Sequence, residues 1–408
     1  MREIRFGTDG VRARHGDWPL TETGIRQIGR ALAVWCSGGR VVVGRDTRQS
    51  SPQLSDALCT GLMEGGSTVL DGGVLPTAAV SCAVVDVEAA AGVMITASHN
   101  PWHDNGVKIL NAAGRKPTAS EMSSLEALFG QTIREDGRGR RAVFSDPAYA
   151  WRARLPVLDL DGVRILLDCA HGAAAPHAPA YLESLGATLV RRGCAPDGKN
   201  INDGVGAMHP PTDLQGCDLA ICLDGDADRL MMVVPGWGTL DGDDMLWLLA
   251  QDATGPVVGT LMTNGGLEAA LGGRLRRSKV GDRYVSALMA ETGARFGAET
   301  SGHVLFSDGM PTGDGLYAAL RILRGRGRAP KLLLPLAGWR RLPTFTLNIR
   351  FTGERISLDT LQTPAAAEAA GQRVIIRYSG TEPVLRILVE GDDGEMWLER
   401  IAAEFSAA

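Results

Sequence analysis

Three successive parts of the chain repeat one order of elements: a strand, a helix and two more strands. The strand-like runs are short and apolar, and they lie at 41–44, 67–70 and 92–95, at 163–167, 187–190 and 219–223, and at 256–260, 275–280 and 294–297. Helix-length stretches separate the first two runs of each set, at 53–64, 175–185 and 266–271. Strand–helix–strand units of this length form parallel strands covered by helices. The repeat therefore predicts three related α/β domains.

The last part of the chain follows a different pattern. Residues 345–351 alternate as a half-buried strand does, and apolar runs at 374–377 and 384–389 precede a helix-like segment at 395–405. We expect three similar mixed-sheet α/β domains plus a small α+β C-terminal domain around a central cleft. The predicted domain limits are 1–147, 148–240, 241–339 and 340–408.

Composition excludes several classes of protein. The 408 residues carry a net charge of −5 and no concentrated basic block, which argues against nucleic acid as a partner. No window has the apolar length of a membrane span, and the first residues lack the pattern of a signal peptide. Seven scattered cysteines without a CxxC motif indicate reduced thiols. We therefore expect a cytoplasmic protein that does not contact membranes.

A polar segment follows the third strand of each set. These segments occupy residues 96–101, 224–229 and 299–303. In open α/β sheets, ligands bind at the carboxyl ends of the strands. We therefore expect the three segments to face one shared cleft.

The middle segment contains three alternating carboxylates, those of Asp224, Asp226 and Asp228. Without a cation they would repel one another, and all-oxygen ligands suit Mg²⁺ or Ca²⁺ better than zinc. An EF-hand is excluded because Arg229 and Pro235 stand where that loop needs glycine and glutamate. A solvated acidic turn is the alternative, and the pattern favours a metal site over it.

The first segment places Ser98 beside His99, just past a buried strand. Such a pair suggests an activated nucleophile, but taken alone the pattern favours a serine that caps a turn. The dipeptide at 105–106, Asn-Gly, predicts a turn that returns Lys108 to the neighbourhood of Ser98. Alternatively, Lys108 is a surface charge. Near the start, the glycine-rich residues 7–12 end in Arg12, and this stretch is either functional or a plain loop.

Two further segments suit a sugar phosphate. Glu299, Ser301 and His303 alternate, so an extended backbone would direct all three to one side, where they could meet sugar hydroxyls. Residues 279–284 add polar groups at another strand end. In the tail, residues 377–383 and Arg386 offer guanidinium, hydroxyl and backbone N–H donors for a phosphate, or else form a tight turn. Neither a Walker loop nor a GxGxxG motif occurs.

Four segments, at 96–101, 224–229, 297–303 and 377–383, together resemble the α-D-phosphohexomutase superfamily in order and in approximate spacing. The resemblance covers nearly the whole chain and implies four domains that each contribute one loop to a central cleft. Residues 6–12, 279–284 and 312–315 are most similar to the subgroup that acts on glucosamine phosphates. Ala227 departs from that subgroup, which often has glycine there, and Tyr378 replaces a more usual Lys or Pro.

The resemblance implies an isomerase that interconverts glucosamine 6-phosphate and glucosamine 1-phosphate, for amino-sugar nucleotide (UDP-N-acetylglucosamine) and cell-wall precursor synthesis. Ser98 would carry the phosphoryl group, and a sugar bisphosphate would be the intermediate and activator. The Ser98 phosphate, Asp224, Asp226 and Asp228 would hold Mg²⁺, which neutralises the transferring group. Lys108, Arg12 and His99 would assist proton transfer or stabilise charge.

The resemblance also assigns the residues that bind the substrate. The sugar-binding set would be Arg229, Lys279, Gly281, Asp282, Arg283, Glu299, Ser301 and His303. The distal phosphate would meet Arg377, Ser379, Gly380, Thr381 and Arg386. The partner is expected to be a small hexosamine phosphate, and the protein a monomer or a homodimer.

Two alternatives remain open from the sequence. The first is a mutase of the same superfamily that acts on glucose or mannose phosphates. The second is a Mg²⁺-dependent sugar-phosphate phosphatase or a non-catalytic binding protein.

Overall fold

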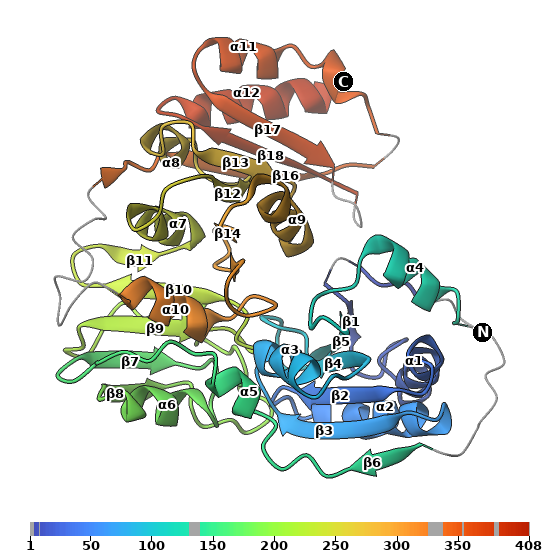
Figure 1. The fold of residues 1–408 in the computed structure, drawn as a ribbon. Helices are drawn as coiled ribbons and strands as arrows, with labels where there is room; N and C mark the ends of the chain where they lie inside the picture. Colours follow the sequence, from blue (N-terminus) through green and yellow to red (C-terminus); the bar gives the residue numbers. More distant parts are fainter. Residues whose placement is uncertain are drawn as a thin grey trace.

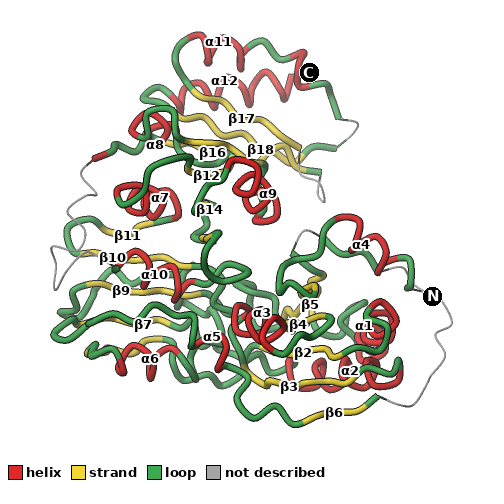
Figure 2. Tube along the Cα trace, viewed as in Figure 1, coloured by secondary structure: helices red, strands yellow, loops and turns green. Residues whose placement is uncertain are grey.

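The computed structural model describes residues 4–7, 9–129, 139–324, 338–352, 355–378 and 383–407. Four sheets follow one another along the chain, and helices cover them (Figure 1). The first and second sheets lie side by side at the bottom of the view, the third lies above the second, and the fourth lies at the top. Figure 2 shows that loops gather between the first three sheets.

The first sheet has six strands in the order β1-β5-β4-β2-β3-β6. They are β1 (Val11–Arg14), β2 (Arg40–Arg45), β3 (Thr68–Val74), β4 (Ala91–Ile95), β5 (Asp104–Asn111) and β6 (Arg140–Ala142). Strands β2, β3, β4 and β6 are parallel, whereas β5 runs antiparallel to both β4 and β1. The helices of this domain are α1 (Glu22–Trp35), α2 (Ser51–Glu64), α3 (Thr77–Asp86) and α4 (Ala119–Glu126).

Alternation along β2 divides the core of this domain between two faces. Val41 and Val43 belong to the apolar cluster that contains α1 and α2 side chains, whereas Val42 belongs to the cluster that contains α3 side chains. Successive side chains of a strand point to opposite faces, so a run of valines can bury both sides of a sheet.

The second and third sheets repeat this plan with fewer strands. The second has the order β11-β10-β9-β7-β8, and the third has the order β13-β12-β14-β15. The strands are β7 (Arg164–Asp168), β8 (Thr188–Arg192), β9 (Leu219–Leu223), β10 (Leu230–Val234), β11 (Gly238–Leu240), β12 (Val257–Thr260), β13 (Leu275–Ser278), β14 (Phe296–Ala298) and β15 (Val304–Phe306). The helices are α5 (Tyr149–Arg152), α6 (Ala178–Ser184), α7 (Gly242–Gln251), α8 (Gly265–Ala270), α9 (Asp282–Thr292) and α10 (Gly315–Leu323).

The fourth sheet is antiparallel and has a separate core. Its order is β16-β18-β17, with β16 (Thr344–Arg350), β17 (Arg373–Tyr378) and β18 (Val384–Glu390). Helices α11 (Thr363–Ala369) and α12 (Gly394–Ala407) lie on one side of this sheet (Figure 1). The side chains of Leu385, Ile387 and Val389 pack with Trp397 and Ile401.

The predicted fold class is confirmed. Each of the first three domains has a parallel core, and the strand after its polar loop returns antiparallel, as β5, β10 and β15 do. The sheets are therefore mixed. Within the described residues, no helix combines the length and the apolar character that a membrane crossing would need.

The predicted turn at Asn105 and Gly106 is wrong, because both residues lie inside β5. The chain reverses earlier, within residues 96–103, and β5 then runs between β4 and β1. A Cβ at position 106 would lie 2.5 Å from the Thr96 carbonyl oxygen and 2.7 Å from that of Val11. The glycine therefore permits close strand packing here and does not make a turn. Lys108 nevertheless lies beside β4, as expected, because it is paired with Met94 in the antiparallel register.

The contact between α1 and α2 gives a stability prediction. Replacing Gly61 by Ala would raise helix propensity by about 1 kcal/mol. However, the added Cβ would lie 2.1 Å from the Arg26 carbonyl oxygen of α1, so the helices would have to separate. We expect Gly61→Ala to lower the free energy of unfolding by about 1–3 kcal/mol, measured with urea. Gln53→Ala, on the exposed side of α2, should change it by less than about 0.5 kcal/mol. A more stable Gly61→Ala protein would contradict this packing.

Candidate active site

Ser98 lies directly after β4 in an unusual backbone conformation. Its φ is 52°, in the left-handed region, and the residue is only 1% exposed. Its N–H donates to Thr96 Oγ1 at 2.9 Å, and its Oγ donates to Asp224 Oδ2 at 2.5 Å. A left-handed conformation costs a non-glycine residue about 1–2 kcal/mol, so surrounding contacts must hold it. The side chain therefore points at the acidic loop of the second domain.

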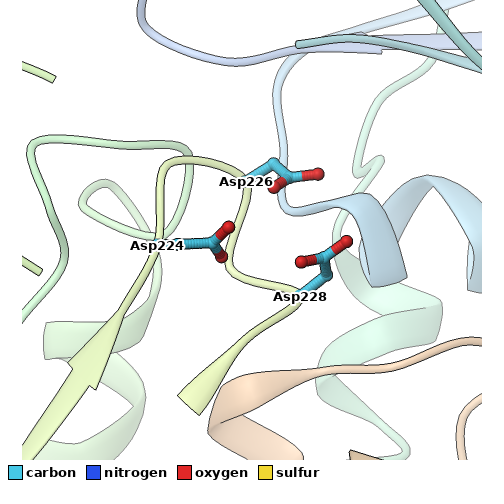
Figure 3. Close-up of side chains that lie close together, drawn as sticks. All are labelled: Asp224, Asp226 and Asp228. Carbon is cyan, nitrogen blue, oxygen red and sulfur yellow. The ribbon is translucent and has the colours of Figure 1, made fainter. Parts of the chain in front are cut away.

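Asp224, Asp226 and Asp228 occupy the loop between β9 and β10, and all three are buried. Ligand oxygens from the three carboxylates lie within 4.8 Å of one another (Figure 3). The loop also presses against the Ser98 backbone, since a Cβ at Gly225 would lie 2.4 Å from the Ser98 carbonyl oxygen. Ala227 has a φ of 61°, a conformation that glycine adopts without strain. Ala227 therefore accepts backbone strain that a glycine at this position would avoid.

Lys108 supplies the main positive charge in this cluster. Its Nζ lies 2.7 Å from both Asp226 Oδ2 and Asp228 Oδ2, and the residue is 2% exposed. Burial alone would lower the pKa of Lys108, but Asp226 and Asp228 raise it well above the usual value. Burial, Asp228 and Asp226 raise the pKa of Asp224 to about 7. The site therefore holds more negative charge than Lys108 neutralises.

The residues present fit a divalent cation. Oδ1 of Asp226 and Oδ1 of Asp228 are buried, and neither accepts a hydrogen bond. Buried acceptors without partners are unfavourable, and a cation would satisfy both at once. Together with the Asp224 carboxylate and the Ser98 hydroxyl, they form an all-oxygen donor set of the kind that Mg²⁺ prefers.

Two of the predicted helper residues lie beside Ser98. His99 Nδ1 is 3.4 Å from Ser98 Oγ, and burial, Arg229 and Arg12 lower the pKa of His99 to about 4. Its imidazole is therefore neutral near pH 7. Arg12 Nη1 donates to Asn100 Oδ1 at 3.4 Å, in the same loop. The Arg229 N–H donates to Asp224 Oδ1 at 3.2 Å.

The segment from Glu299 to His303 is a turn, so the expectation of an extended segment is wrong. The Gly302 N–H donates to the Glu299 carbonyl oxygen at 2.9 Å, and Gly302 has a φ of 86°. Consequently, the side chains diverge. Glu299 Oε1 accepts the Gly281 N–H at 2.8 Å, whereas His303 reaches the metal loop. Ser301 is half-buried within the turn.

His303 joins the sugar-loop segment to the carboxylates. Its Nδ1 lies 3.7 Å from Asp228 Oδ1, and its Nε2 lies 3.5 Å from Asp282 Oδ2. Burial opposes protonation, but Asp228 and Asp282 outweigh it and raise the pKa of His303 to about 9. The imidazolium thus lies between the second and third domains with a carboxylate on each side.

The remaining predicted sugar-binding residues surround the start of α9. Arg283 Nη2 donates to the Tyr284 hydroxyl at 2.7 Å, and Lys279 Nζ lies 5.9 Å from the centre of the same ring. Asp282 pairs with Lys116 Nζ at 2.7 Å. Lys116, which the sequence reasoning missed, also pairs with Asp9, so it joins the first domain to the third.

Lys116 lines two cavities. One of about 170 Å³ is lined by Asp9, Lys108, Lys116 and Arg283, among others. A second cavity of about 490 Å³ lies between the residues before α4 and one side of α9.

Thr77, at the start of α3, is a second residue that the sequence reasoning missed, and its hydroxyl donates to Asp226 Oδ2. No local motif marked Lys116 or Thr77.

The predicted phosphate loop is described only at its flanks. Arg377 of β17 and Arg386 of β18 are direct partners in the antiparallel register. Burial and Arg386 lower the pKa of Arg377. Like charges directly opposite each other destabilise a sheet, so this pair suits an anion between them. Ser379, Gly380 and Thr381 lie outside the described residues.

The cluster around Lys108 predicts a stability change that depends on Mg²⁺. Lys108→Met removes the partner of two buried carboxylates, which should cost about 3–5 kcal/mol of unfolding free energy in EDTA. Excess MgCl₂ should reduce this loss, because the ion would pair with the same oxygens. Lys199→Met, at an exposed lysine, should change the free energy by less than about 0.5 kcal/mol. An equal loss in EDTA and in MgCl₂ would contradict a metal site at these carboxylates.

Comparisons with known proteins agree along the whole chain. Models of the phosphoglucomutase/phosphomannomutase family match in order: domain I at 3–135, domain II at 152–238, domain III at 241–332 and the C-terminal domain at 362–408. The phosphoglucosamine mutase of Aeromonas hydrophila is 39% identical, with 100% of both chains covered. That of Xanthomonas campestris is also 39% identical, with 97% of both chains covered.

Solved structures share the arrangement of the four domains. A phosphoglucomutase/phosphomannomutase family protein from Burkholderia thailandensis has a TM-score of 0.79 at 25% identity, covering 98% of this chain and 96% of its own. The N-acetylphosphoglucosamine mutase of Aspergillus fumigatus, solved with GlcNAc-6P and magnesium, has a TM-score of 0.70 at 17% identity, covering 99% of this chain and 96% of its own. The chain therefore belongs to the phosphoglucomutase/phosphomannomutase family of α-D-phosphohexomutases.

Proposed function

We propose that the protein is a phosphoglucosamine mutase, an isomerase that interconverts glucosamine 6-phosphate and glucosamine 1-phosphate. The observation that carries this proposal is the contact between Ser98 Oγ and Asp224 Oδ2, at 2.5 Å, inside a buried cluster of three carboxylates. The names of relatives that are 39% identical support the amino sugar as the substrate. The phosphate group of this substrate suits the cations around the cavities beside Lys116.

Ser98 is the proposed phosphoryl carrier. The phosphoserine would donate its phosphoryl group to a hydroxyl of the sugar phosphate, and the resulting bisphosphate would return the other phosphoryl group to Ser98. Asp224, Asp226 and Asp228 would hold Mg²⁺, which would neutralise charge on the transferring group when bound. Lys108 adds a fixed positive charge in the same place. Phosphoryl transfer depends mostly on such charge neutralisation and on positioning.

Proton transfer requires a group that changes its protonation state near Ser98. His99 lies 3.4 Å from Ser98 Oγ and is neutral near pH 7, because its pKa is lowered to about 4. It is the proposed proton acceptor when the Ser98 hydroxyl takes up a phosphoryl group. Lys108 is proposed to stabilise charge, since Asp226 and Asp228 raise its pKa well above the usual value. The guanidinium of Arg12 is proposed to act in the same way.

The sugar and the distal phosphate would be held by the other two loops. The hydroxyl and amino groups would meet Glu299 and Ser301, with His303 nearby and with Lys279 and Arg283 beside them. The distal phosphate would meet Arg377, Arg386 and the segment that contains Ser379, Gly380 and Thr381. With the sugar and the distal phosphate held by separate loops, the bisphosphate would have to turn over, because only Ser98 exchanges a phosphoryl group with it.

Intact-protein mass spectrometry tests the role of Ser98. After incubation with a hexose bisphosphate, the protein should gain the mass of one phosphoryl group, and peptide analysis should place it on Ser98. Ser98→Ala should show no gain and no mutase turnover, while its thermal unfolding stays close to that of the wild type. Ser184→Ala, at an exposed serine of α6, should keep both the phosphoryl gain and the turnover. A fully active Ser98→Ala protein would refute the mechanism.

Substrate preference separates this proposal from mutases of glucose or mannose phosphates. The values of kcat/KM should be compared for glucosamine, glucose and mannose 6-phosphates under one set of conditions. We expect the highest value for glucosamine 6-phosphate. An equal or higher value for glucose or mannose 6-phosphate would contradict the proposed amino-sugar substrate. The assignment to the phosphohexomutases would not be affected.

A further inference from the structure

Arg48 lies between β2 and α2, and it is 1% exposed. Its guanidinium donates to four backbone carbonyl oxygens, three in the loop that begins at Ser98 and one at Asp104, the first residue of β5. Nη2 lies 2.9 Å from Ser98 O and 2.8 Å from Asn100 O, while Nη1 lies 2.9 Å from Asp104 O and also contacts Pro101 O. One buried side chain thus holds the backbone of the entire Ser98 loop.

The charge of Arg48 is balanced on the opposite side. Nε donates to Asp46 Oδ2 at 2.8 Å, and both side chains are fully buried. Asp46 is itself fixed, because its Oδ1 accepts from the Ser51 hydroxyl at 2.6 Å and from the Arg48 N–H at 3.1 Å. The pair therefore adds no net charge to the loop. Its effect is geometric, since a planar guanidinium directs its N–H groups along fixed directions.

A second donor reaches the same carbonyl groups from the second domain. Asn202 Nδ2 lies 2.9 Å from Ser98 O and 3.0 Å from Asn100 O. Asn202 has a φ of 61° and is 8% exposed, so its side chain is held in place. The Ser98 carbonyl oxygen is consequently fixed by one donor from each domain.

We propose that Arg48 and Asn202 are positioning residues for phosphoryl transfer. They hold the carbonyl oxygen of Ser98 on one side of the loop, which keeps Ser98 in its left-handed conformation and directs Oγ to Asp224. Small displacements of a reacting group, on the order of 1 Å, can lower a rate about 100-fold. This inference rests on the proposed function, because Ser98 must be the group that is phosphorylated.

Arg48→Lys tests the proposal, since lysine keeps the charge but cannot direct donors to four separate oxygens. We expect kcat to fall about 100-fold, with KM changed less than about two-fold. Arg274→Lys is the matched control. Arg274 donates to the carbonyl oxygens of Gly255, Ala250 and Ala253, at 2.9, 3.3 and 2.7 Å, away from the site. Its replacement should leave kcat unchanged even if the protein is less stable.

Hydrogen exchange supplies a readout that does not need activity. Amides of residues 96–104 should exchange faster in Arg48→Lys than in the wild type, while those of β2 and β4 stay protected. Asn202→Gly removes the amide without backbone strain, and it should lower kcat and speed exchange in the same segment. If Arg48→Lys does not fold, the kcat and the exchange rates of Asn202→Gly test the proposal alone. Wild-type kcat and exchange in either variant that folds would overturn the proposal, whereas an inactive wild type would overturn only the proposed function.

Discussion

The ion pairs of Lys108 connect the parts of this molecule that matter for its chemistry. Its ammonium group lies 2.7 Å from carboxylate oxygens of both Asp226 and Asp228, and none of these side chains is substantially exposed. Carboxylates buried without a counter-ion would cost several kcal/mol, so the acidic loop of the second domain depends on a lysine of the first. His303 brings the third domain to Asp228. Three domains thus meet at one buried set of charges, and Ser98 lies at its edge.

Much of this arrangement was predictable from the sequence, because apolar runs that end in polar segments mark strands whose ends carry a site. The contact of Ser98 with Asp224 is an example, since each follows a buried strand. Predictions from local patterns were wrong at two segments whose conformation depends on the surrounding backbone. Asn105 and Gly106 resemble a hairpin turn, but the glycine serves close packing between two strands. Glu299 to His303 resembles an extended segment, but Gly302 closes it into a turn.

Residues that act through tertiary contacts left no local signal. Arg48 reaches a carbonyl group 50 residues away, and Asn202 reaches the same oxygen across 104 residues. A single arginine or asparagine within a polar segment is normally predicted to be a surface residue. Only the fold shows that the N–H groups of Arg48 and Asn202 donate to buried acceptors. Lys116 is similar, because its partners Asp9 and Asp282 lie in two different domains. Sequence reasoning therefore proposed residues for the chemistry but missed residues that hold them in place.

In the proposed mechanism, Ser98 passes a phosphoryl group to the sugar and not to water. A single-turnover experiment can follow this transfer, with protein labelled with ³²P on Ser98 and mixed with unlabelled glucosamine 6-phosphate. We expect the label to appear first in a sugar bisphosphate and then in sugar monophosphate, with little inorganic phosphate. Release of the label mainly as inorganic phosphate, or its retention on the protein, would contradict this mechanism.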